Sequence, residues 1–145
     1  MKFLKYLTGI FAVTLLLNCI GVNASNYLIL NNVAVPMKQQ SSPAVTGKDE
    51  ISQQYVQNTT TSHNRGFQAQ VLGKDIFGNT CSTTYKNLPK NTWTTHGNYT
   101  TDGCGLEPVG DKAFLNVRTS SSYNDTTFFW GTWITTESLY NAMTK

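Results

Sequence analysis

The sequence FQAQVL, at positions 67–72, indicates the fold more clearly than any other stretch of this chain. Phe67, Ala69 and Val71 alternate with two glutamines. Successive side chains of a β-strand point to opposite faces, so this alternation predicts a strand with one apolar face and one polar face. The segment therefore favours a protein built from sheets that bury one face each.

Further short strands are predicted on both sides of this segment. They are rich in Thr, Tyr, Phe, Trp and Val, which favour extended backbone. The first of them, Tyr27–Val35, begins with residues that are apolar on both faces, so we expect it in the interior of a sheet. The others follow at short intervals: Ile51–Val56, Ile76-Phe77, Thr80–Tyr85, Trp93–Tyr99, Ala113–Thr119 and Thr126–Thr135.

Turn signals separate these strands. Pro36–Asp49 is predicted as a long loop because it holds two prolines and a glycine. Gly78-Asn79 predicts a two-residue hairpin turn, since glycine accepts a positive φ at the first central position. Glu137–Met143 is either a closing helical turn or a frayed tail. Seven or eight short strands at this spacing predict an antiparallel β-sandwich, with a small β-barrel as the alternative.

Composition supports an all-β fold and excludes several other classes. The chain has 145 residues, which fits one domain, and a formal net charge of +3. Charged residues make up 13% and aromatic residues 12%, whereas about 25% of residues are charged in ordinary domains. Disorder requires few aromatics, and a coiled coil requires charged flanking positions, so both are excluded. No basic cluster is present, which argues against nucleic-acid binding.

The N-terminus has the pattern of a secretory signal. Lys2 and Lys5 precede an apolar run, and small residues occupy the positions that a signal peptidase reads before cleaving after Ala24. We expect residues 1–24 to be removed, which leaves a single secreted or periplasmic β-domain of residues 25–145. Losing two lysines lowers the net charge from +3 to +1, so the charge indicates no anionic partner.

Two other interpretations of the N-terminal segment are less favoured. An uncleaved membrane anchor needs about 20 apolar residues, whereas the run Leu7–Val22 has 16. A lipoprotein would be cut before Cys19 and acylated there, and the preceding leucines fit that pattern. Asn18, however, is bulkier than the small residue that such a site prefers. Cleavage after Ala24 is therefore the favoured prediction.

Cys81 and Cys104 are the two cysteines that remain after this cleavage. An even count in an exported chain predicts one disulfide. Closing a loop of about 24 residues stabilises the fold by about 3 kcal/mol in the chain-entropy treatment. A metal pair is disfavoured because no C-x-x-C is present and His63 and His96 lack ligand spacing. We predict no metal site and no cofactor.

Exposed aromatic residues are the candidates for ligand binding. Flat aromatic faces beside hydrogen-bonding side chains recognise sugars, and Trp and Tyr also dominate protein-binding hot spots. Thr126–Thr135 carries aromatics at both alternating sets of positions, so they either reach solvent or fill the core. The predicted function is a non-catalytic binding module for a carbohydrate or a protein surface, with these candidate contact residues: Trp93, Tyr99, Tyr123, Trp130 and Trp133.

Two alternative functions use some of the same features. A membrane-acting, toxin-like protein would place Trp and Tyr at a bilayer interface. A net charge of +1 gives little attraction to anionic lipid, so membrane contact is not favoured. A small hydrolase would use His96 as a base, Asp102 to orient it and a nucleophile from Ser82 or Ser120–Ser122. The simpler interpretation places His96 on a polar strand face exposed to solvent.

Overall fold

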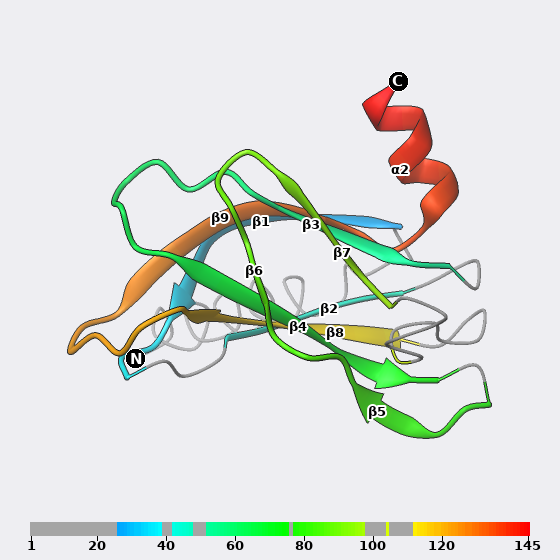
Figure 1. Cartoon of the computed structure of the whole chain (residues 1–145), viewed down its shortest axis with the longest axis horizontal. Coiled ribbons are helices and arrows are strands. Elements are labelled where there is room, and N and C mark those ends of the chain that lie inside the picture. The colour runs from blue at the N-terminus through cyan, green and yellow to red at the C-terminus, as the bar shows by residue number, and fades with distance from the viewer. Residues whose placement is uncertain (1–25, 39–41, 48–51, 76, 98–103, 105–111) are drawn as a thin grey trace, which may run out of the picture.

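The computed structural model describes residues 26–38, 42–47, 52–75, 77–97, 104 and 112–145. Within these residues the chain forms two antiparallel sheets that pack face to face (Figure 1). This confirms the predicted all-β sandwich. Several sequence-based expectations lie outside the described residues, namely the signal segment 1–24 with Cys19, and Ile51, Ile76, Tyr99 and Asp102.

The first sheet, sheet A, contains four strands in the order β1-β9-β3-β7. Strand β9, which comes last in the sequence, lies between β1 and β3. Its Trp133 stands opposite Leu28 of β1 and Val56 of β3. The strands have these bounds: β1 Tyr27–Val35, β3 Gln54–Asn58, β7 Trp93–His96 and β9 Thr127–Ile134.

The second sheet, sheet B, has the order β2-β8-β4-β5, and a short strand β6 also pairs with β4. Strand β4 contains the FQAQVL segment and pairs along its length with β8. The strands have these bounds: β2 Ser42–Gly47, β4 Phe67–Lys74, β5 Thr80–Ser82, β6 Lys86–Asn87 and β8 Lys112–Thr119.

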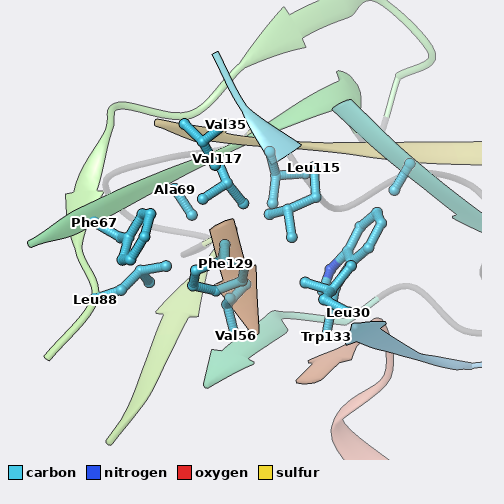
Figure 2. Packing of buried hydrophobic residues seen from close by; sticks show 12 residues of the cluster. Leu30, Val35, Val56, Phe67, Ala69, Leu88, Leu115, Val117, Phe129 and Trp133 are labelled. Carbon is cyan, nitrogen blue, oxygen red and sulfur yellow. The ribbon is translucent and has the colours of Figure 1, made fainter. Parts of the chain in front are cut away.

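The core lies between the two sheets and is built from alternate residues of the facing strands (Figure 2). Phe67, Ala69 and Val71 are buried, as the alternation in FQAQVL predicts. The ring of Phe67 meets the ring of Phe129 edge to face, with centroids 5.0 Å apart. The buried cluster comprises Leu30, Val35, Val56, Phe67, Ala69, Val71, Leu88, Ala113, Leu115, Val117, Phe129 and Trp133.

Strand β1 lies at the edge of sheet A, so the prediction that it occupies the interior of a sheet is wrong. Ile29 is 66% exposed and Tyr27 42% exposed. Apolar residues on both faces of β1 therefore reflect an apolar outer surface rather than burial by neighbouring strands. The register of β1 against β9 shifts between Leu30 and Val33, where Asn32 has a φ of 57°, which marks a β-bulge.

Two further elements were not specified by the sequence pattern. Ser42–Gly47 forms β2 inside the predicted loop, at the edge of sheet B. Pro43 is tolerated there because an edge strand does not need every backbone N–H for pairing. Glu137–Thr144 forms the eight-residue helix α2, which decides between the helical turn and the frayed tail.

The disulfide between Cys81 and Cys104 is present, as predicted. The two Cα atoms lie 5.6 Å apart, within the usual range for a bridged pair. Cys104 is buried and forms an isolated antiparallel bridge with Asp75. The bond therefore ties a distant segment of the chain to the β4–β5 hairpin.

The turn between β4 and β5 differs from the predicted two-residue hairpin. The N–H of Asp75 donates to the carbonyl of Asn79 at 2.9 Å, which leaves three residues in the loop. The N–H of Gly78 donates to the carbonyl of Asp75 at 3.0 Å, and Gly78 has a φ of 85°. Glycine thus occupies the left-handed position of a longer turn, where a side chain would be strained.

Candidate functional site

Sheet A carries a cluster of aromatic and apolar side chains on the side that faces away from sheet B. Along β9 the buried Phe129 and Trp133 alternate with the more exposed Phe128 and Trp130. Because successive strand residues point to opposite sides, Phe128 and Trp130 belong to the outer surface. We call this surface the outer aromatic face and define it by these residues: Ile29, Gln57, Trp93, Phe128, Trp130 and Thr132.

One row of this face crosses all four strands. Thr132 stands opposite Ile29 on one side and Gln57 on the other, and Gln57 stands opposite Trp93. The row therefore places two hydrogen-bonding side chains side by side at its centre, with an aliphatic residue at one end and an indole at the other. Next to this row the rings of Phe128 and Trp130 lie tilted, with centroids 6.4 Å apart.

The outer aromatic face is uncharged. The four strands of sheet A contain no Asp, Glu, Lys or Arg. In sheet B, by contrast, Lys74, Lys86, Lys112 and Arg118 lie within the strands. A ligand on sheet A would therefore meet aromatic rings, a hydroxyl group and an amide, and no ionic group from the strands.

Helix α2 covers one end of sheet A and leaves the rest of the outer aromatic face open. It rises on the side of the sheet that faces away from sheet B (Figure 1). The ring of Tyr140 stacks on Tyr55, with centroids 3.7 Å apart, and meets Trp93 edge to face at 5.5 Å. Trp93 is thereby held at the border of the helix, and it keeps part of its surface exposed.

Trp133 is a core residue, which corrects its expected place among the ligand contacts. Its side chain has no exposed surface. The indole Nε1 donates to Oε1 of Gln54 at 2.9 Å, so the polar atom of the ring is satisfied inside the protein. Trp133 points inwards and the neighbouring Thr132 points outwards along β9. The sequence alone did not specify which of these two sides faces the core.

Tyr123 lies in the loop before β9, and one face of its ring is covered by Arg65. The guanidinium carbon of Arg65 lies 4.2 Å from the centre of the Tyr123 ring. Arg65 also donates to both carboxylate oxygens of Asp125, at 2.6 and 3.0 Å, and to Oγ1 of Thr127 at 2.6 Å. Tyr123 is therefore part of a clamp between two loops, and it lies outside the outer aromatic face.

The ion pair in this clamp predicts a loss of stability in acid. The hydrogen bond from Arg65 holds the pKa of Asp125 below its usual range. A carboxyl group with a lowered pKa stabilises the fold above its unfolded pKa of about 3.9, and this is lost as the pH falls through the lower folded value. We expect the free energy of unfolding to decrease below about pH 4. The Asp125→Asn variant should show a weaker dependence of this free energy on pH in the same range.

Urea unfolding measured across this pH range checks the prediction. In an Arg65→Gln background, Asp125→Asn should not change the dependence of the unfolding free energy on pH any further, because the guanidinium partner of Asp125 is already absent. An equal effect of Asp125→Asn in both backgrounds would contradict the assignment of the acid sensitivity to this pair.

His96 is fully buried, so the expectation that it lies on a solvent-exposed strand face is wrong. It stands opposite Gln54 of β3, and Gln54 binds the core residue Trp133. The polar side of β7 is thus the side that faces the core. Ser82 and Ser120–Ser122 are exposed, so the proposed base and its nucleophile candidates occupy different environments.

A cleft of 270 Å³ opens at the end of the sandwich, between the segment 60–66 and Leu88–Lys90. His63 is fixed in its wall because its Nε2 donates to the carbonyl of Phe128 at 3.1 Å and its Nδ1 accepts from the N–H of Arg65 at 3.2 Å. A second cleft of 510 Å³ adjoins it and reaches Ser120 and Ser121. Neither cleft is lined by Trp or Tyr, so neither contains the predicted aromatic contacts.

The part of the chain that the structure describes contains neither a cluster of metal ligands nor a membrane-spanning helix. No group of three or more His, Cys, Asp or Glu residues lies close enough there to hold a metal ion. No helix there is long and apolar enough to cross a membrane.

Of the predicted contact residues, the structure brings Trp93 and Trp130 onto one face, while Tyr99 lies outside the described residues. Phe128 and Ile29 belong to the same face and were not among the candidates. The alternation in Thr126–Thr135 already places Phe128 on the same side as Trp130. Comparison with protein-family models, curated protein sequences and solved structures finds no match to this chain.

Proposed function

We propose that the protein is a non-catalytic binding module whose outer aromatic face holds an uncharged carbohydrate. The observation that carries this proposal is the open pair of rings, Phe128 and Trp130, on a sheet without charged residues. The C–H groups of a pyranose ring form a flat apolar surface that stacks on an aromatic ring. Gln57 and Thr132 lie on the same face and offer donors and acceptors to sugar hydroxyls.

A neutral sugar suits this face better than a protein surface does. Protein hot spots also use aromatic rings, but they commonly combine them with Arg. The strands of sheet A contain no Arg and no other charged residue. A neutral glycan needs only stacking surfaces and uncharged hydrogen-bonding groups, and these are the groups present.

The proposal includes export of the protein to the periplasm or the exterior. The Cys81–Cys104 disulfide supports this, because such bonds persist in oxidising compartments. The N-terminal pattern of two lysines, an apolar run and a small-residue cleavage site supports it as well. In those compartments a small binding module meets envelope and extracellular polysaccharides.

Replacing Trp130 by alanine tests the proposal. We expect the wild-type protein to bind neutral oligosaccharides on a glycan array, and Trp130→Ala to weaken that binding at least about tenfold, as for other aromatic anchors. Titration calorimetry with the best array ligand gives the affinities, and a thermal melt shows whether each variant is folded.

Phe114→Ala provides the control. Phe114 is an exposed aromatic residue on β8 of the other sheet, outside the outer aromatic face. We expect this variant to bind like the wild type. Equal losses from Trp130→Ala and Phe114→Ala, or no binding of any neutral glycan by the wild type, would rule out the outer aromatic face as a sugar site.

A further inference from the structure

Helix α2 covers an aromatic ring, that of Tyr55, which continues the outer aromatic face along sheet A. Tyr55 lies two residues before Gln57 on β3, so both side chains point to the outer side of the sheet. It stands opposite Ile134, which lies on the same side of β9 as Trp130. Tyr55 is 5% exposed and Ile134 has no exposed surface, although neither belongs to the cluster between the sheets. Both are therefore buried on the outer side, where Tyr140 of α2 stacks on Tyr55.

Polar side chains separate Tyr55 from the open rings of the outer aromatic face. Trp130 and Ile134 are four residues apart on β9, which corresponds to about 13 Å at the usual rise along a strand. Gln57 and Thr132 stand opposite each other between these two positions. Along the strands, the outer side thus presents open rings, then two hydrogen-bonding side chains, then a covered ring. This order suits an oligosaccharide, whose sugar rings stack on aromatic faces and whose hydroxyl groups pair with amides and hydroxyls.

Tyr140 occupies the position that a sugar ring would take on Tyr55. The two tyrosine rings are parallel within 1°, with centroids 3.7 Å apart. Aromatic pairs favour offset or edge-to-face contacts, so this directly overlapping arrangement is not the one that two rings prefer. Trp93 borders the same position and meets the Tyr140 ring edge to face at 5.5 Å. A pyranose ring in place of Tyr140 would contact both Tyr55 and Trp93.

Helix α2 is held against the sheet by few of its side chains. Of its eight side chains, those of Leu139 and Tyr140 are half-buried and the other six are exposed. Its N-cap residue, Thr136, makes no side-chain hydrogen bond to the first turn. Isolated helices shorter than about 12 residues are marginal in water. We therefore expect α2 to unwind when Tyr140 leaves Tyr55, so that the covered form depends on the helix propensity of α2.

We propose that Tyr55 and Trp93 form a second stacking site, which Tyr140 occupies in the free protein and a sugar unit of a neutral oligosaccharide occupies in the complex. This second stacking site rests on the proposed sugar binding by the outer aromatic face, and it extends that binding to ligands that reach from Trp130 to Tyr55. A short ligand binds the open rings and leaves α2 in place. A longer ligand releases α2, and its affinity is lowered by the cost of opening the covered form.

Two substitutions at Asn141 test this proposal without changing the sheet. Asn141 is an exposed residue of α2, where alanine favours the helix and glycine disfavours it. The probes are the uncharged disaccharides and hexasaccharides of glucose, mannose and galactose, titrated by calorimetry. We expect Asn141→Gly to bind a hexasaccharide about fivefold more tightly than Asn141→Ala, which is the difference in helix propensity expressed as an equilibrium constant. Any disaccharide that binds should bind both variants equally.

Amide hydrogen exchange of the wild-type protein follows the release of α2 directly. A bound hexasaccharide should speed the exchange of residues 137–144, because they leave the sheet and unwind, while exchange in β3 and β9 becomes slower or stays the same. A bound disaccharide should leave the exchange of residues 137–144 unchanged. A permanent cover would instead keep its protection, or gain protection, when a hexasaccharide binds.

The outcomes separate the second stacking site from the proposed function. Hexasaccharide binding that Trp130→Ala weakens, but that is equal in the two Asn141 variants and leaves the exchange of α2 unchanged, would keep the outer aromatic face as a sugar site and overturn the second stacking site. If no hexasaccharide binds to the wild type or to Asn141→Gly, the proposed function and the second stacking site both fail.

Discussion

Replacing Trp133 by alanine is expected to lower the free energy of unfolding by about 3–5 kcal/mol, the usual cost of truncating a buried tryptophan. Trp133 is fully buried between the sheets, opposite Leu28 and Val56 of its neighbouring strands (Figure 2). Removing the indole leaves a cavity that these strands cannot close without breaking their pairing with β9. Urea unfolding followed by far-ultraviolet circular dichroism measures the loss.

Two further variants separate packing from hydrogen bonding at this position. Trp133→Phe keeps most of the apolar volume but removes the donor to Gln54 Oε1, so we expect a smaller cost, of about 1–3 kcal/mol. Trp130→Ala changes a partly exposed tryptophan three residues earlier on the same strand and should cost clearly less than Trp133→Ala. If the two alanine variants were equally destabilised, the assignment of Trp133 to the core and Trp130 to the surface would be wrong.

Gly131→Ala is the second change for which we expect a large effect, of about 3 kcal/mol, at the upper end of the range for overpacking. A Cβ atom at Gly131 would collide with the carbonyl oxygen of Gln57 on β3 and lie 2.8 Å from two ring carbons of Phe129. The carbonyl belongs to the backbone and cannot rotate away. The strand β9 would have to move from β3, which disturbs the centre of sheet A.

Thermal and urea unfolding of Gly131→Ala beside Thr132→Ala checks this prediction. Thr132 is the next residue of β9 and points to the outer face, where truncation to alanine adds no atom that could clash. We expect Thr132→Ala to change the stability by about 0.5 kcal/mol or less, as for most surface positions. A Gly131→Ala protein as stable as the Thr132→Ala protein would show that β9 and β3 are less tightly packed than the structure indicates.

The sequence predicts most strands because side-chain alternation depends on local backbone geometry. Phe67, Ala69 and Val71 face the core as their spacing requires. The same local rule cannot say which side of a strand is inside when both sides are apolar or both are polar. In β9 that choice between Trp130 and Trp133 follows from the register with β1 and β3, which is a long-range property.

His96 shows the same limit from the polar side. Its strand alternates correctly, but the side that carries His96 is the one that faces the core, opposite Gln54. A polar strand face usually lies in water. In this protein, however, the polar side chains of Gln54 and His96 are buried, and Gln54 binds the core residue Trp133. The environment of His96 is therefore set by the pairing of β3 with β7 and not by its neighbours in the sequence.

Phe77 lies in a turn and not at the end of a strand, and the sequence pattern failed here for a different reason. The dipeptide Ile76-Phe77 looks like the end of a strand, and Gly78-Asn79 looks like the turn that follows it. The carboxylate of Asp75 moves the start of the turn towards the N-terminus by accepting two backbone hydrogen bonds, which places Phe77 inside the loop. Side-chain control of a turn by one aspartate is a local effect, so a rule for aspartate before a glycine turn would have found it.

The strand order of sheet A determines when this protein can fold. Within the described residues, β1 pairs only with β9, and about 100 residues separate these two strands in the sequence. Until β9 has been synthesised, β1 has no strand to join and β3 can pair only with β7. A chain that emerges from the ribosome therefore completes sheet A only after β9 has been synthesised. Once released, it must bring its two ends together over a long loop, and such non-local pairing places its folding on a timescale of milliseconds to seconds.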